Sequence, residues 1–187
     1  MVPDRDDGDL LNAYLDGDEE AFTELMRRHE DRIFAMALKM MGNRSDALDA
    51  TQDTFIRAFR NASKFRGDSA FGTWLYRIGL NSCHDLLRKR KRDPVPEEEI
   101  EQAGAHLPGV DEGVVLNMEL GEALAGLQED YRAAVLMHDL GGIPYEEIAV
   151  ITEVSIGTVK SRISRGRRKL AELLEHPTAP DASKGGR

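Results

Sequence analysis

The chain of 187 residues has little that fits a secreted, membrane-spanning or cysteine-rich protein. Its one cysteine, Cys83, excludes an intrachain disulfide and a cysteine-rich metal cluster. No apolar run is long enough to cross a membrane, and the acidic first residues are unlike a signal peptide. We therefore expect a protein of the reducing cytoplasm that does not insert into a membrane.

The sequence also lacks the alternation of apolar and polar residues that marks a half-buried strand. Apolar residues recur at helical spacing instead. The first stripe comprises Phe22, Leu25, Met26, Ile33, Met36, Ala37 and Met40. A second stripe contains Leu48, Phe55 and Phe59. A third, over residues 70–92, contains Phe71, Trp74, Leu75, Ile78 and Leu86. About four more helices are predicted to begin near Val114, Glu129, Pro144 and Ser155, so the predicted fold class is all-α.

One segment has no helical periodicity. Residues 93–113 contain three prolines and three glycines, with seven acidic residues and no Lys or Arg. We interpret this segment as an acidic flexible linker between two small helical domains, residues 10–92 and 114–176. An acidic disordered tail at 1–9 and a disordered tail at 177–187 complete the predicted organisation.

Charge is unevenly distributed along the chain. The net charge is −9, from 25 Lys and Arg against 34 Asp and Glu, and the acidic residues gather in the N-terminal segment and the linker. Cations gather in two places, at residues 88–92 and 158–169. The acidic segments should repel a nucleic acid and weaken sequence-independent binding. A DNA-binding protein of this composition is expected to need a partner that brings it to DNA.

The cations at 158–169 lie in a predicted helix-turn-helix. Pro144 suits the first turn of one helix, and Ser155 is a good N-cap for the next. Ile156, Val159 and Ile163 recur at helical spacing and are expected to face the core. The opposite face, together with the cap, presents the DNA-binding candidates Ser155, Thr158, Lys160, Ser161, Arg162, Arg165 and Arg168. A solvated basic face would have similar composition, but the spacing of the two helices favours DNA binding.

Two further polar groups precede the linker. Asp49, Gln52 and Asp53 share one helix face by their i, i+3 and i+4 spacing. Residues 64–69 form a short polar loop in which Gly67 permits a tight bend. A helix with the basic run 88–92 at its end follows this loop.

Residues 46–92 closely resemble region 2 of bacterial RNA polymerase sigma factors of the extracytoplasmic-function (ECF, group IV) type. Residues 144–170 resemble region 4 of the same family. The resemblance extends from about residue 10 to 174, and no region 3 domain fits in the linker. Glu153 departs from the glycine that is frequent in the family's helix-turn-helix, and Gly79 departs from the usual alanine.

The resemblance implies a transcription initiation factor whose partners are core RNA polymerase, through its β and β′ subunits, and promoter DNA. Many relatives are inhibited by an anti-sigma factor, which makes such a protein a third candidate partner. The resemblance assigns binding of the β′ clamp helices to Asp49, Gln52, Asp53 and Phe55, of which Phe55 also fits a core position.

The resemblance also implies that the melted −10 strand is captured by region 2, with one base flipped into a pocket. The residues implied in −10 binding are Lys64, Phe65, Arg66, Asp68, Ser69, Arg77, Asn81, Arg88 and Arg90. Phe71, Trp74 and Tyr76 offer aromatic surface near the loop, although core packing suits Trp74 better. No cofactor is expected. Because the sequence has no GxxxxGK[ST] motif, DNA opening would be driven by binding energy.

Other interpretations apply to parts of the chain. The resemblance implies that the linker follows the RNA exit path of the polymerase, but a plain tether fits its composition equally well. A one-component regulator would explain residues 144–170 but not residues 46–92. A hydrolase using Cys83, His84 and Asp85 is disfavoured, because adjacent helical residues point about 100° apart and cannot form a triad. We expect that the chain is not an enzyme.

Overall fold

The computed structural model describes residues 5–92 and 120–175. The regular structure within these ranges is helical, as the sequence predicts, and none of these helices is long and apolar enough to span a membrane. The predicted linker at 93–113, the helix start near Val114 and the tail at 177–187 lie outside the described residues. The N-terminal domain comprises α1 (Asp7–Leu15), α2 (Glu19–Met41), α3 (Arg44–Asn61), the short turn η1 (Ala62–Lys64) and α4 (Phe71–Arg92).

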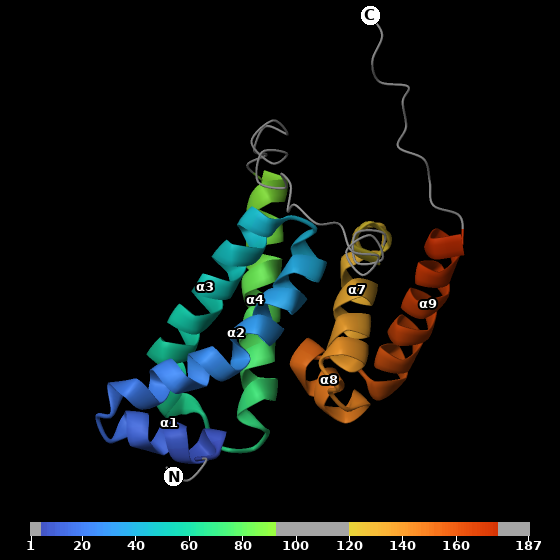
Figure 1. The fold of residues 1–187 in the computed structure, drawn as a ribbon. Helices are drawn as coiled ribbons and strands as arrows, with labels where there is room; N and C mark the ends of the chain where they lie inside the picture. Colours follow the sequence, from blue (N-terminus) through green and yellow to red (C-terminus); the bar gives the residue numbers. More distant parts are fainter. Residues whose placement is uncertain (1–4, 93–119, 176–187) are drawn as a thin grey trace, which may run out of the picture.

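The helices α2, α3 and α4 pack against one another, and α1 packs against α2 (Figure 1). Asp6, Asp18 and Asn43 are N-caps, and each side chain accepts a hydrogen bond from a backbone N–H of the first turn. Gly42 ends α2 in the left-handed conformation, with φ 77°, which a glycine adopts without strain. Helix α1 begins before Leu10, within the segment that the sequence assigns to the acidic tail.

The predicted inward stripe of α3 is wrong in two positions. Leu48 is 49% exposed and Phe59 is 51% exposed, although Phe55 is buried. The inward face consists mainly of small residues, including Ala47, Ala50, Thr54 and Ala58. Small side chains allow α3 to approach α2 and α4 closely, and the larger apolar side chains are left at the surface. Met26 of α2 is likewise 36% exposed, against the prediction.

The glycine at position 79 has a packing role. A Cβ at this position would lie 2.6 Å from Met36 Cε and 3.4 Å from Thr54 Oγ1. The backbone of α4 therefore approaches both α2 and α3 at this point. This close approach explains why glycine occupies position 79, although glycine weakens an isolated helix.

The second domain is helical from Leu120 and contains α7 (Glu129–Val135), the π-helical turn η3 (Leu136–Leu140), α8 (Tyr145–Thr152) and α9 (Ile156–Glu175). Its core includes Met137, Ile148, Val159 and Ile163. The prediction that Ile156 faces this core is wrong: it is 40% exposed, because it occupies the first position of α9 and lies at the end of the packed face.

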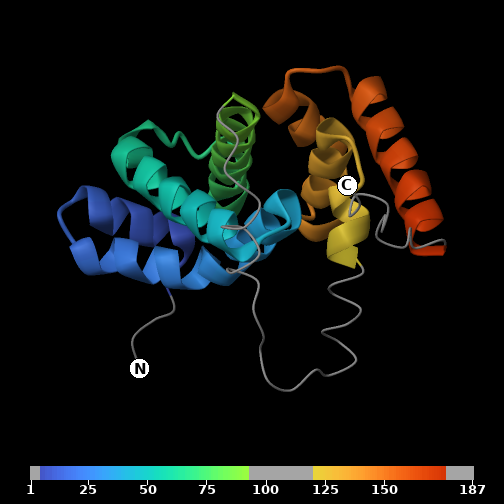
Figure 2. The same ribbon diagram turned by 90° about the horizontal axis from the view of Figure 1, so that it is seen from above.

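The two domains lie side by side, with α7 next to α4 and α2 (Figures 1 and 2). The buried Tyr76 hydroxyl of α4 donates to the Leu136 carbonyl of η3 at 3.0 Å. Glu129 of α7 accepts from His84 Nδ1 at 2.5 Å and from Lys91 Nζ at 2.9 Å. Arg132 donates to the Met40 carbonyl at the end of α2. The domains therefore share a continuous interface with polar contacts along it.

Candidate nucleic-acid and partner interfaces

A groove with a volume of about 940 Å³ lies between α2 and α3. Its walls include the half-exposed Leu48, Phe59 and Ile56, together with Met26. An apolar groove of this kind on a protein surface marks a site for another macromolecule, and an amphipathic helix is a ligand of suitable shape.

Polar residues at the groove differ in their availability. Asp49 and Gln52 line the groove and are exposed, and neither has a hydrogen-bond or ion-pair partner among the described residues. Asp53 does not line this groove but a separate cavity between α3 and α4. It accepts from Arg57 at 2.7 Å, and Arg57 also donates to Asp85 at 2.7 Å. The pKa of Arg57 is raised, mainly by its hydrogen bond to Asp85 and to a lesser extent by its hydrogen bond to Asp53, although desolvation by burial acts to lower it. The carboxylate of Asp49 is thus available for an ion pair with a cationic side chain of a partner, whereas the charge of Asp53 is already balanced by Arg57.

The helix-turn-helix is formed by α8 and α9. Ser155 caps α9, accepting from the Thr158 N–H at 3.1 Å, as predicted. Glu153 ends α8 in the left-handed conformation, with φ 53° and ψ 38°. A residue with a Cβ adopts this conformation at a cost of about 1–2 kcal/mol. The turn is therefore built in the geometry that glycine would favour.

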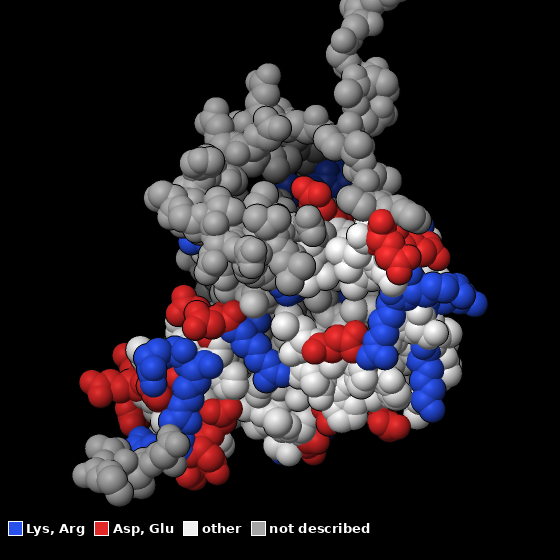
Figure 3. All heavy atoms as spheres, turned by 45° about the vertical axis from the view of Figure 1, so that its right-hand side comes forward, with Lys and Arg blue, Asp and Glu red and all other residues white. Residues whose placement is uncertain are grey.

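Cations on α9 fall into two groups. Arg162 pairs with Asp130 at 2.5 Å, Arg167 pairs with Asp139, and Lys169 pairs with Glu172 at 3.2 Å. The exposed Lys160, Arg165 and Arg168 have no ion-pair partner within the described ranges, although Lys160 lies 5.9 Å from the Tyr145 ring. Figure 3 shows Lys and Arg side chains gathered on the right, over the side that carries α9. The unpaired cations are those most available to a polyanion.

The loop at 65–70 rests on an aromatic cluster. The Phe65 ring lies 5.8 Å from Phe71 and 5.3 Å from Trp74, and Phe71 lies 5.5 Å from Trp74. Phe65 and Trp74 are partly exposed, whereas Phe71 is buried. Tyr76, expected as exposed aromatic surface, is completely buried at the interface between the domains, so that expectation is wrong. Its burial raises the pKa of its hydroxyl well above the usual value.

Polar side chains of the loop are largely available. Arg66 and Asp68 are exposed and have no polar partner among the described residues, while Lys64 donates to Asn61 at 2.7 Å. Ser69 makes a weak bond of 3.4 Å to the Ala70 carbonyl. This arrangement leaves hydrogen-bonding groups at the rim of the aromatic cluster.

Other predicted −10 residues lie apart from the loop. Asn81 is further along α4 and lines a separate cavity of about 260 Å³, together with His84, Asp130 and Arg162. Arg77 is exposed and has no partner within residues 5–92 and 120–175. The structure therefore does not bring Asn81 into one pocket with the loop.

The basic run at the end of α4 is mostly engaged within the protein. Arg88 pairs with Asp85, and Arg90 pairs with the buried Asp46 at the start of α3. Lys91 pairs with Glu129. Lys89, which the sequence identifies only as a member of the basic run 88–92, is exposed and lacks a polar partner in the described residues. Its free charge was not visible from the run of like residues.

Residues 83–85 point to three different environments. Cys83 is buried, and burial raises the pKa of its thiol to about 12. His84 contacts Glu129, and Asp85 contacts Arg57 and Arg88. Burial opposes ionisation of Asp85, but hydrogen bonds from Arg57 and Arg88 outweigh it and lower its pKa. An unreactive thiol and separated partners do not form a nucleophilic site.

Two helical domains with an apolar partner groove and a basic helix-turn-helix define a DNA-binding protein that works with another protein. Comparison with protein families supports this class. Residues 25–93 match the model of Sigma-70 region 2, and residues 117–170 match the model of Sigma-70, region 4.

Individual relatives extend the match to nearly the whole chain. The ECF RNA polymerase sigma-E factor of Haemophilus influenzae is 36% identical, over 96% of this chain and 99% of its own length. The ECF RNA polymerase sigma factor SigM of Mycobacterium tuberculosis is 37% identical, over 91% of this chain and 86% of its own. The chain belongs to the ECF family of RNA polymerase sigma factors, and it is a transcription initiation factor that acts with core RNA polymerase and promoter DNA.

Solved structures of sigma factors are similar to this chain. The sigma factor RpoE in complex with the anti-sigma factor NepR from Bartonella quintana is similar with a TM-score of 0.67 and 29% identity, covering 83% of this chain and 97% of that one. CnrH in complex with the cytosolic domain of CnrY gives a TM-score of 0.64 and 29% identity, covering 89% and 95%.

Proposed function

We propose that the groove between α2 and α3 receives the β′ clamp helices of core RNA polymerase. The observation that supports this assignment most directly is the position of Asp49 and Gln52, free of partners, on the wall of an exposed apolar groove. Apolar side chains in such a groove supply buried area, and an unpaired carboxylate selects a partner with a cation opposite it. Phe55 is buried and supports the groove floor.

The experiment is a titration of core polymerase with the fluorescently labelled full chain and its variants. Leu48→Asn and Asp49→Ala should each raise the Kd about five- to tenfold, since interface residues of this kind contribute about 1 kcal/mol or more. Asp53→Ala should have a smaller effect because Arg57 already neutralises this carboxylate. Asp31→Ala, an exposed carboxylate of α2 outside the groove, is the matched control. Equal Kd values for Leu48→Asn, Asp49→Ala and the control would overturn the assignment.

We further propose that α9 reads the −35 element. Its exposed Lys160, Arg165 and Arg168 are free to contact bases and phosphates, with Ser155, Thr158 and Ser161 near the helix start. Arg162 must leave Asp130 before it can contact DNA. Its contribution in the bound state is reduced by the loss of that ion pair.

We propose that the loop at 65–70 captures a flipped base of the melted −10 strand. The aromatic cluster supplies stacking surface, and Arg66, Asp68 and Ser69 supply polar contacts at its rim. We assign phosphate contacts to the exposed Arg77 and Lys89, while Arg88 and Arg90 must first exchange their carboxylate partners. Melting is then driven by binding energy, and the chain performs no catalysis of its own.

The side-by-side arrangement of the domains has a consequence for promoter binding. Asn81 opens onto a cavity whose other walls belong to α7, α8 and α9. Asn81 is exposed, but a DNA strand that contacts it would lie against the second domain unless that domain moves away. We propose that the chain is closed before it meets the polymerase in the cytoplasm and opens on binding. One solved relative is in complex with an anti-sigma factor, and we propose that an anti-sigma factor stabilises the closed form of this chain.

A further inference from the structure

A second open pocket lies between the −10 loop and the beginning of α1. Its volume is about 610 Å³. One wall comes from the loop and the start of α4, and the opposite wall comes from residues 5–8 and Arg28; the lining includes Asp6, Phe65, Ser69 and Phe71. The N-terminal segment therefore faces the loop to which −10 binding is assigned above.

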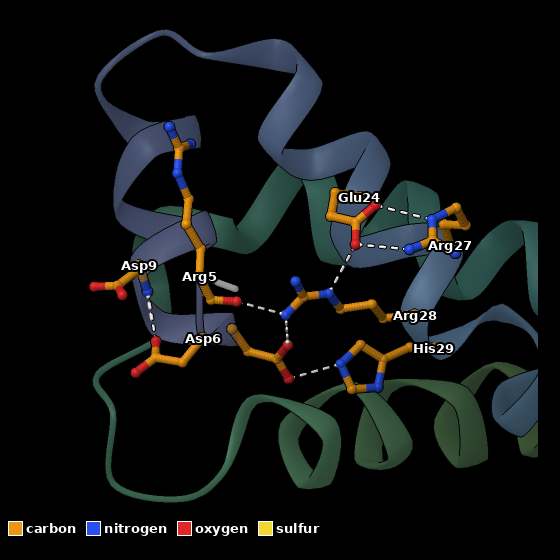
Figure 4. Close-up of polar contacts among 8 residues, drawn as sticks. Arg5, Asp6, Asp9, Glu24, Arg27, Arg28 and His29 are labelled. Carbon is orange, nitrogen blue, oxygen red and sulfur yellow. Dashed lines mark hydrogen bonds and ion pairs between the residues drawn. The ribbon is translucent and has the colours of Figure 1, made fainter. Parts of the chain in front are cut away.

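Residues 5–9 are held in place by a network of charged groups (Figure 4). Arg28 donates to the Arg5 carbonyl at 2.7 Å and pairs with Glu24 at 2.9 Å and with Asp7 at 3.5 Å. Asp7 also contacts His29 Nε2 at 2.7 Å. The His29 ring lies 5.5 Å from the Phe71 ring, so the same network reaches the aromatic cluster. The far wall of the pocket is consequently a fixed surface.

The chemistry of this wall distinguishes a base from a phosphate. The carboxylates Asp7 and Glu24 surround the Arg28 guanidinium and balance its charge. Asp6 uses Oδ1 to accept the Asp9 N–H at 2.8 Å, whereas no hydrogen bond to its Oδ2 occurs within the described residues. Arg5, the other cation of the lining, pairs with Asp18 at 3.3 Å. A phosphate in this pocket would therefore meet carboxylates and cations that are already paired. A neutral planar ring that stacks on Phe65 and donates N–H to a carboxylate fits instead.

We propose that Asp6 forms the second wall of the −10 pocket and accepts a hydrogen bond from the exocyclic amino group of the flipped base. This inference rests on the proposed capture of a base by the 65–70 loop, and it adds a specificity-determining residue outside that loop. It predicts discrimination against thymine, which has no amino group, at the flipped position.

The test uses holoenzyme assembled from core polymerase and the full chain. A pool of single-stranded oligonucleotides, randomised over the −10 region, is bound and sequenced. Asp6→Ser removes the carboxylate but keeps an N-cap, because serine caps helices as well as aspartate. Asp9→Asn, an exposed carboxylate of the same helix turn outside the pocket, removes the same charge and is the control. Phe65→Ala reports on the loop itself.

The wild type should disfavour thymine at one position by roughly 5- to 150-fold, the range for a good side-chain contact to a base. Asp6→Ser should reduce this preference at least fivefold at that position only, and Asp9→Asn should retain it. A second set of oligonucleotides carries a base without the amino group, either purine in place of adenine or 2-pyrimidinone in place of cytosine. The wild type should bind these oligonucleotides more weakly than those with the natural base, whereas Asp6→Ser should bind both with equal affinity.

Two results would overturn the inference, and they differ. If Phe65→Ala loses selectivity while Asp6→Ser keeps the wild-type preference, the loop captures a base without Asp6. If the wild-type holoenzyme selects no base at any position, capture by the loop is itself wrong, and the role of Asp6 falls with it.

Discussion

The hydrogen bond between Tyr76 and the Leu136 carbonyl gives a quantitative test of the closed arrangement. Tyr76→Phe removes the donor without changing the ring that packs between the domains. The Leu136 carbonyl also accepts from the Gly141 N–H at 2.9 Å, so it keeps one partner. The loss is therefore that of a single hydrogen bond, about 0.5–1.5 kcal/mol, and not the larger penalty of an orphaned carbonyl. At about 1 kcal/mol the ratio of closed to open chains falls about fivefold.

The closed fraction can be measured by energy transfer between fluorophores on Ser45→Cys and Ala171→Cys, both at exposed positions of different domains. Cys83 should stay unlabelled, because it is buried and the pKa of its thiol is raised to about 12. Tyr14→Phe is the matched control, since Tyr14 stacks on Phe22 in the first domain and its hydroxyl has no partner among the described residues.

Opening should also strengthen polymerase binding. If only open chains bind core, the apparent Kd equals the intrinsic value divided by the open fraction, so Tyr76→Phe lowers it by up to the same fivefold factor. Transfer efficiency and Kd that match those of Tyr14→Phe would refute the reasoning. A change in unfolding free energy alone would show that the bond stabilises the fold without controlling closure.

Four further outcomes are expected. Burial alone would raise the pKa of Glu129, but hydrogen bonds from Lys91 and His84 outweigh burial and lower this pKa. The ionised Glu129 side chain therefore stabilises the contact between the domains fully above its unfolded-state pKa of about 4.3. This stabilisation is lost as the pH falls through the lower pKa of the folded state. Energy transfer should therefore decrease below about pH 4.3, less so in Glu129→Gln. Arg165→Ala should weaken −35 duplex binding by about 1–3 kcal/mol if the contact is to a base edge, and unchanged promoter selection would contradict this. Gly166→Ala should lower the free energy of unfolding by about 1–3 kcal/mol, because its Cβ would lie 2.7 Å from Val135 Cγ2 and 3.3 Å from the Tyr131 carbonyl oxygen. Gly79→Ala should cost less in a denaturant titration, since the flexible end of Met36 can shift.

The sequence predicts helix positions well because apolar periodicity and caps are local signals. Ser155 caps α9 as expected, and Gly42 ends α2. The same periodicity misplaces Leu48 and Phe59, because a stripe of large apolar residues is typical both of a core and of a partner groove. Only the packing of small residues on the other face of α3 distinguishes the two cases.

Candidate site residues were selected by charge and by resemblance, and neither reveals intramolecular pairing. Arg90, Arg162 and Asp53 each meet an opposite charge in the structure, and the pairs of Arg90 and Arg162 join residues more than thirty positions apart. Such pairing depends on tertiary packing, which a motif does not encode. Asp6 was assigned to a disordered tail for the same reason: its acidic neighbours hid a capping residue held beside the loop.

Intramolecular pairing of functional cations also bears on specificity. A sigma factor with all its basic residues exposed would bind any duplex through phosphates, and its affinity would depend mainly on salt. If Arg88, Arg90 and Arg162 contact DNA as proposed, each exchanges a carboxylate for DNA, so the contact gains only the difference between two ion pairs. The exchange is favourable where promoter geometry places a phosphate or base edge correctly, and is unfavourable on arbitrary DNA. Under this proposal, carboxylates such as Asp130 and Asp46 act against non-specific binding, and contacts between polymerase and the groove of α2 and α3 supply the affinity that remains.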